Sequence, residues 1–175
     1  MYKQLSIILL AVLLVTACNT KESLQHFMVK QEEQEDVFTF DLSNNFLQLN
    51  EEFQTPDNQK ILSTIKKINL MAFRLKEGNE EKYTKDVATL RSLLSEEKYS
   101  PLMTFGKGSR GVKVYAIGDE DTLDELIVLG NDHETGWLIV RILGDDMQPE
   151  KIMSLMGKFD FDKDELPLED LKAFF

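Results

Sequence analysis

Residues 102–143 read LMTFGKGSRGVKVYAIGDEDTLDELIVLGNDHETGWLIVRIL, a stretch in which short apolar runs alternate with turns. The runs show little helical periodicity and span 102–105, 111–117, 123–130 and 137–143. Glycine, aspartate and asparagine lie between them, as is typical of turns. Connections this short allow consecutive strands to pair antiparallel. We therefore predict a β-meander in this half of the chain.

Two more strands are predicted upstream of the meander. Apolar and polar residues alternate in Val37–Leu42, which is typical of a strand with one buried face. Lys66–Leu75 is apolar on both of its alternating sides. This second pattern indicates a central strand that is covered on both faces.

Helical spacing of apolar residues predicts helices around these strands. Thr55-Pro56-Asp57 is either a turn or the start of one further short helix. The predicted helices and their inward residues are Leu24, Phe27 and Met28 in the first; Phe46, Leu49 and Phe53 after a cap at Ser43; Tyr83, Val87, Leu90 and Leu94 in the longest, Glu80–Tyr99; and Ile152, Leu155, Met156 and Phe159 after Pro149.

The order of these elements predicts an α+β fold, because the strands cluster late in the chain. We expect a mainly antiparallel β-meander sheet with helices packed on one face, preceded by a lipoprotein signal peptide. The predicted segments are a signal peptide at 1–17, a lipidated cysteine with a tether and short helix at 18–35, a single α+β domain at 36–160, and an acidic C-terminal segment at 161–175.

The first residues have the pattern of an export signal. One basic residue, Lys3, precedes an apolar run from Leu5 to Val15 that only Ser6 interrupts. The run is shorter than the roughly 20 residues that a membrane span needs. A basic head, a short apolar run and small residues at its end are typical of a secretory signal.

Val15-Thr16-Ala17-Cys18 resembles the lipobox of bacterial lipoproteins. The resemblance implies cleavage before Cys18 and acylation of its thiol and its new amino group. Cys18 is the only cysteine, so no intrachain disulfide can form. Anchoring takes at least two membrane-binding signals, which several acyl chains supply. Asn19 stands where this family often has an aspartate for inner-membrane retention, which favours the outer membrane in a Gram-negative cell. We expect the protein to face the periplasm.

The chain is acidic, with a formal net charge of −11. Removal of residues 1–17, whose only charge is Lys3, would make it −12. Such a surface repels nucleic acids and anionic headgroups, so we expect no nucleic-acid partner. We expect the lipid on Cys18 to hold the protein at the membrane.

Two loops resemble known binding motifs. Gly106–Gly111 matches G-x-G-x-x-G, but a strand rather than a helix follows it, so we interpret it as a hairpin turn. Asp160–Asp164 begins like a calcium-binding EF-hand loop. Glu165 stands where the glycine should be, and Leu171 where the bidentate glutamate should be. We therefore expect no metal and no cofactor.

The histidines, His26 and His133, are far apart in sequence and do not have metal-site spacing. His133 lies in the turn Asn131–Gly136 between Asp132 and Glu134, two carboxylates that would raise its pKa if they are near. An enzyme would need His133 to meet acids in a pocket formed by folding. The simpler interpretation is an exposed turn histidine, and we name no catalytic residue.

The mature chain resembles the bacterial lipoproteins known as domain of unknown function 4252. The lipobox carries the resemblance, with Phe38–Phe46, Ile68–Leu75, the strands Val112–Ile117, Leu123–Leu129 and Leu138–Gly144, and Ile152–Met156. It implies a small exported lipoprotein without an established activity. We therefore expect a non-enzymatic interaction or signalling module with an envelope protein partner. The alternatives are an envelope protein that binds a ligand or lipid in an apolar cavity between sheet and helices, and an enzyme.

Overall fold

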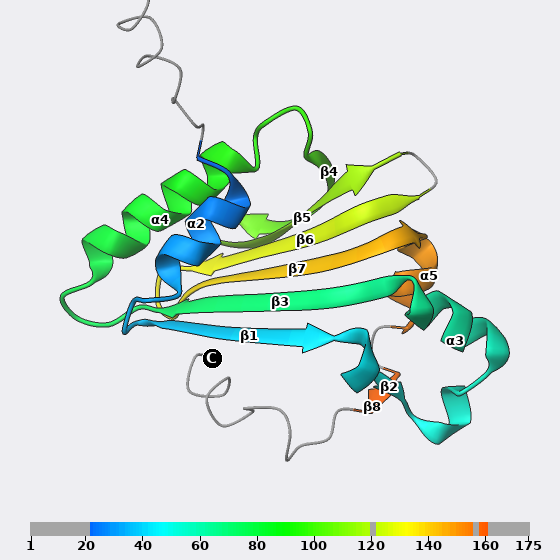
Figure 1. Ribbon diagram of the computed structural model, residues 1–175. Coiled ribbons are helices and arrows are strands. Elements are labelled where there is room, and N and C mark those ends of the chain that lie inside the picture. Colours follow the sequence, from blue (N-terminus) through cyan, green and yellow to red (C-terminus); the bar gives the residue numbers. More distant parts are fainter. Residues whose placement is uncertain (1–21, 120–121, 156–157, 161–175) are drawn as a thin grey trace, which may run out of the picture.

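The computed structural model describes residues 22–119, 122–155 and 158–160. Within them the chain forms a six-stranded antiparallel sheet in the order β1–β3–β7–β6–β5–β4 (Figure 1). The strands are β1 (Val37–Ser43), β3 (Ile65–Arg74), β4 (Ser100–Lys107), β5 (Arg110–Gly118), β6 (Leu123–Asp132) and β7 (Gly136–Met147). The α+β prediction and the antiparallel meander β4–β7 are confirmed.

Strand β3 lies inside the sheet, as its two apolar faces predicted. It pairs with β1 on one side and with β7 on the other, so the early β1–β3 pair extends the late meander. Leu70 lies opposite Phe40 of β1 and Val140 of β7. Side chains in a row across the sheet share one face because they occupy paired positions.

Helices α2 (Leu24–Gln31) and α4 (Glu80–Leu93) pack on one face of this sheet (Figure 1). Their apolar sides join alternating residues of β3, β5, β6 and β7 in one core. Fully buried members include Phe27, Leu90, Phe73, Ile127 and Ile139. The α2 residues that we placed in the segment before the domain therefore form part of the core of the fold.

Helices α3 (Pro56–Ser63) and α5 (Pro149–Leu155) add a second, smaller apolar core at one end of the opposite face. Ile152 of α5 is buried there with Ala116, Leu126 and Met147, and Ile61 of α3 packs against them. This end of the sheet lies at the right of Figure 1, beside α3 and α5. The two faces of the sheet are therefore covered unequally.

Three predicted helices differ from the structure. The helix after Pro149 was predicted to reach Phe159, but α5 ends at Leu155 and Phe159 lies in strand β8 (Phe159–Asp160). The helix predicted after Ser43 is replaced by the 3-10 turns Asn44–Phe46 and Glu51–Phe53, with the two-residue strand β2 (Gln48–Leu49) between them. Leu47 and Leu49 are both buried, and this spacing of two residues suits an extended chain. Strand β2 pairs with β8 (Phe159–Asp160), a partner more than 100 residues away that local periodicity does not reveal.

The longest helix ends at Leu93, earlier than predicted. Residues 95–98 are Ser-Glu-Glu-Lys and provide no apolar side for the sheet, so extending the helix would bury nothing. The chain turns there, and Tyr99 is buried in the core before β4 begins.

A buried ion pair lies beneath α2. Arg141 of β7 contacts Glu125 of β6 through Nε–Oε1 at 2.6 Å and Nη2–Oε2 at 2.9 Å. Its third nitrogen, Nη1, donates to the side-chain carbonyl of Gln25 on α2. A second polar group links α2 to α4, where Lys82 donates to Asp86 at 2.6 Å and to Gln31 at 2.5 Å. These contacts fix the helices on the sheet.

No helix among the described residues is long and apolar enough to cross a membrane.

Candidate binding face

The sheet face opposite α2 and α4 is only half covered. Its residues form rows across the strands, because each lies opposite its neighbour in the next strand. The row Leu42, Ile68, Ile142, Leu126 and Ala116 belongs to the core under α3 and α5. The next two rows lie beyond these helices.

We call these two rows the open face. The first row contains Phe40, Leu70, Val140, Val128, Val114 and Met103, and the second contains Ala72, Leu138, Gly130, Val112 and Phe105. Apart from Ala72 these residues remain partly or fully exposed. Phe105 is 59% and Val112 38% exposed. Within the described part of the chain, Val114 is the one residue of the open face that packs against an apolar core, the one under α3 and α5; the others belong to neither core.

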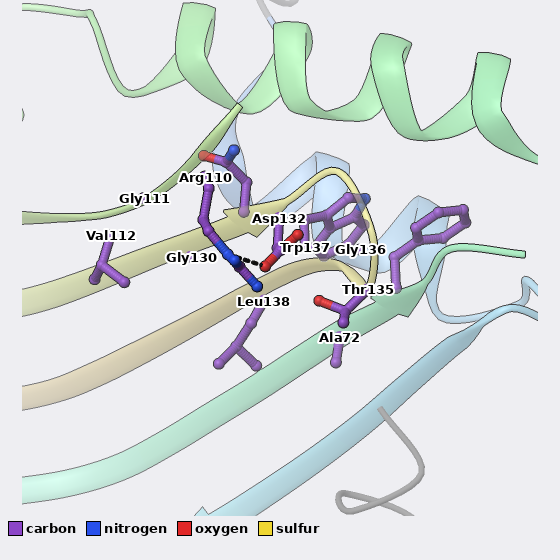
Figure 2. A pocket seen from close by; sticks show the side chains of 12 residues that line it. Ala72, Arg110, Gly111, Val112, Gly130, Asp132, Thr135, Gly136, Trp137 and Leu138 are labelled. Carbon is purple, nitrogen blue, oxygen red and sulfur yellow. Dashed lines mark hydrogen bonds and ion pairs between the residues drawn. The ribbon is translucent and has the colours of Figure 1, made fainter. Parts of the chain in front are cut away.

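A shallow pocket of about 260 Å³ opens on the second row, next to the β6–β7 turn (Figure 2). Val112, Leu138 and Ala72 line its apolar part and point away from the helices in Figure 2. Trp137 lies on the helix side of the same strands. The pocket is smaller than the roughly 300–1,000 Å³ of sites that enclose a drug-sized ligand. It is therefore a depression in a larger apolar surface.

Charged residues border the open face at the β6–β7 turn. The next row across the sheet consists of Arg74, Gly136, Asp132, Arg110 and Lys107, each paired with its neighbour in the adjacent strand. Arg110 Nε contacts Asp132 Oδ2 at 2.5 Å, as Figure 2 shows. Arg74 and Lys107 form no ion pair with a described residue. This basic border holds three positive charges and one negative charge.

The carboxylate of Asp132 is held in its charged form. The backbone N–H of Glu134 donates to it at 2.8 Å, and this contact contributes most to lowering its pKa. Partial desolvation opposes the change, while the hydrogen bond and charge of Arg110 lower the pKa further. Asp132 therefore anchors Arg110 at the edge of the open face.

The structure places His133 beside Ser109 and two acids. Its Nδ1 is 3.4 Å from Ser109 Oγ and 3.8 Å from Asp132 Oδ1, and its Nε2 is 3.8 Å from Glu134 Oε1. The imidazole is 55% exposed. Donor–acceptor distances in a working triad are about 2.6–3.2 Å, within a site that excludes water. The turn therefore has residue types of a triad without its close contacts or its burial.

The glycine motif forms a hairpin turn, as predicted. Gly106 and Gly111 face each other across β4 and β5, and Gly106 has a φ of +82°. A Cβ on Gly106 would lie 2.4 Å from the Arg110 carbonyl oxygen. The glycines therefore serve the close approach of two strands, and the chain after them is the strand β5.

The remaining predicted sites fall in different places. Cys18 and residues 161–164 of the EF-hand-like loop lie outside the described residues, and Asp160 belongs to β8. His26 is exposed on α2, where its backbone N–H donates to Ser23 Oγ at 3.1 Å. In the described part of the chain, no three His, Cys, Asp or Glu side chains are placed to hold a metal ion.

The space between the sheet and α4 is filled by side chains, and a pocket of about 230 Å³ between α2 and the sheet is lined largely by polar residues, among them Gln25, Asn69 and Arg141. Leu90 of α4 and the facing Ile127 and Ile139 have no solvent exposure, and Met71 and Leu129 have 1%. The ligand-binding hypothesis required an apolar cavity at this interface. The apolar pocket beside Trp137 opens instead on the opposite side of the sheet.

Sequence reasoning missed the open face. The apolar alternation of β1 and the two-sided apolar pattern of β3 were the available signals, and both were interpreted as burial. They did not reveal that α3 and α5 are too short to reach the rows nearest the β6–β7 turn.

The comparisons with known proteins identify a family. No curated protein and no solved structure matches the chain. The model of one family, described as Domain of unknown function (DUF4252), matches residues 27–155, from α2 to the end of α5. That match covers most of the chain and every strand of the large sheet, so this protein belongs to the DUF4252 family.

Proposed function

We propose that this protein is an exported lipoprotein, anchored by acyl chains on Cys18 in the outer membrane and facing the periplasm, that acts as a non-enzymatic interaction or signalling module. The anchor is supported by the signal-like residues 1–17 and by the lipobox-like sequence that ends at the single cysteine. Five residues lie between Cys18 and α2, so an anchor on Cys18 would keep the start of α2 within roughly 22 Å of it.

The open face is the observation that carries the interaction role. Large contiguous apolar patches on small proteins mark sites of association. The open face spans neighbouring strands of one rigid sheet, so it is preformed for docking. The basic border adds charge at one end. The partner that fits this chemistry is an envelope protein with an apolar docking segment flanked by acidic residues.

Site-specific cross-linking in intact cells tests the interaction. A photoreactive benzoylphenylalanine at Phe105 or Val112 is expected to trap the same envelope protein from both positions. The matched control position is Val29, which is equally accessible at 50% exposure but lies on α2, across the sheet. Capture of one protein from both open-face positions and not from Val29 supports the proposal. The same products from all three positions contradict it.

The partner's chemistry is tested with the cross-linked protein once it is identified. Lys107→Glu reverses one charge of the basic border without removing apolar area. We expect the trapped yield at Val112 to fall, and to fall further as salt is lowered, because repulsion between like charges is least screened at low ionic strength. A yield that Lys107→Glu leaves unchanged would contradict an acidic docking segment.

The anchor is tested by mass measurement of the N-terminal peptide. We expect cleavage before Cys18 and an added mass of acyl chains, and we expect Cys18→Ser to release the protein from the membrane fraction. An unmodified Cys18 would overturn the proposed location while leaving the interaction surface to be judged by cross-linking.

A further inference from the structure

The chain itself contains a segment that matches the open face. Residues 161–175 read FDKDELPLEDLKAFF and follow strand β8 directly. Their apolar residues are Phe161, Leu166, Leu168, Leu171, Ala173, Phe174 and Phe175. Five acids and two lysines stand among them. The segment therefore combines apolar side chains with negative charge, the chemistry that the open face and its basic border call for.

The segment also begins in the right place. Lys158, just before β8, accepts a hydrogen bond through its carbonyl from Asn50 N–H at 3.0 Å, and β8 pairs with β2. Figure 1 shows β2 and β8 beside α3, near the end of β1. That end of β1 carries Leu42, in the row adjoining the open face. Strand β8 therefore ends beside the covered half of the sheet, where the row of Leu42 adjoins the open face.

Its length is sufficient. From the row of Leu42 to the basic border is six residues along a strand, or about 20 Å. The segment 161–175 spans about 22 Å if it is helical and about 50 Å if it is extended. Either conformation reaches across both rows and brings acidic residues to Arg74, Arg110 and Lys107.

We propose that residues 161–175 dock on the open face of the same molecule and that the envelope partner must displace them. The inference rests on the proposed function, because it regulates the same surface. Apolar side chains of the segment cover Phe40, Val128, Leu138 and their neighbours. The acids face the basic border. A tethered segment acts at high effective concentration, so a modest affinity is enough to keep the face occupied.

Cross-linking within the purified full chain tests the docking. Benzoylphenylalanine replaces Leu171 or Phe174, and the products are mapped by peptide mass spectrometry. An equal amount of 15N-labelled chain is included, so that products between two molecules are recognised by mixed labels. We expect single-label products that join the segment to β5 or β7, at peptides containing Val112 or Leu138.

Variants of exposed residues supply the control. Phe105→Asp and Val112→Asp are expected to lower the intramolecular yield about tenfold, because each adds a charge to the apolar contact. Val29→Asp places the same charge on α2, at similar exposure, and should leave the yield unchanged. Products on α2 or α4, products with mixed labels, or yields unaffected by both open-face variants would each overturn the proposal.

The regulatory part has its own readout in intact cells. Leu171→Asp weakens the segment's docking and is expected to raise the yield of partner trapped by benzoylphenylalanine at Val112. If the segment cross-links in the purified chain but no partner is trapped at Val112, the docking stands and the proposed function fails. If a partner is trapped at Val112 and the segment does not cross-link, the proposed function stands and this inference fails.

Discussion

Arg141 and Glu125 form a two-point ion pair that is buried between β7 and the helix α2. Both side chains are about one-tenth exposed, and the two contacts measure 2.6 and 2.9 Å. Gln25 of α2 accepts the remaining hydrogen bond of the guanidinium. The pair therefore occupies the gap that an apolar core would otherwise fill, and it links the helix to the sheet.

Removing one member of this ion pair should lower the free energy of unfolding more than replacing both members with apolar residues. Glu125→Ala leaves the guanidinium buried without its counter-charge, and we expect a loss of about 3–5 kcal/mol in unfolding free energy. The double variant Glu125→Leu with Arg141→Met should lie within about 1 kcal/mol of the parent or above it. Urea unfolding measures both. Equal losses in the single and double variants would contradict this account.

Replacing the indole of Trp137 with a phenyl ring should lower the free energy of unfolding less than removing the aromatic ring altogether. The indole stacks on Phe73 at 5.8 Å and meets Phe27 at 5.8 Å, while its buried Nε1–H finds no acceptor among the described residues. An unmet donor costs about 1–3 kcal/mol, which offsets the smaller volume of phenylalanine. We expect Trp137→Phe to change unfolding free energy by about 1 kcal/mol or less, and Trp137→Ala to lower it by about 3–5 kcal/mol.

Substitution by alanine should have opposite effects on stability at two glycines of neighbouring strands, Gly136 and Gly130. Gly136 has a φ of +133°, and a Cβ there would lie 1.9 Å from the Phe73 carbonyl oxygen. Gly136→Ala should therefore lower unfolding free energy by about 2 kcal/mol or more. Gly130, with its nearest neighbour at 3.9 Å, has room for the methyl group. Gly130→Ala should be neutral or raise stability by up to about 1 kcal/mol, because alanine loses less chain entropy. Thermal unfolding compares them.

Asp132 should make stability depend on acid pH. The pKa of Asp132 is lower in the folded protein than its usual value of 3.8. Its contribution to the free energy of unfolding is therefore fully present above pH about 3.8, and it is lost as the pH falls through the folded-state pKa. Asp132→Asn should therefore be less stable than the parent at pH about 6, and the gap should narrow by pH about 3. Glu150→Gln removes one negative charge from an exposed side chain in the first turn of α5 and is the matched control. A gap that stays constant over this range would contradict the assignment.

Much of the fold was readable from local patterns. The meander followed from four apolar runs separated by turn residues, and the inner place of β3 from its two apolar faces. The segment 44–53 was misread as a helix because Leu49 owes its position to β8, a partner far along the chain. Spacing within a window of ten residues does not contain that contact.

The candidate binding face could not be predicted from the sequence, because it depends on how the helices pack on the sheet. Alternation in β1, β3 and the meander established that two apolar faces exist, because side chains on a strand point alternately to its two sides. The signal-like start and its cysteine are likewise features of the linear sequence. Which face is covered, and how far, depends on where α2, α3, α4 and α5 pack and on their lengths. Only the tertiary structure therefore separates the buried rows from the open face, since burial is a property of neighbours that lie far apart along the chain.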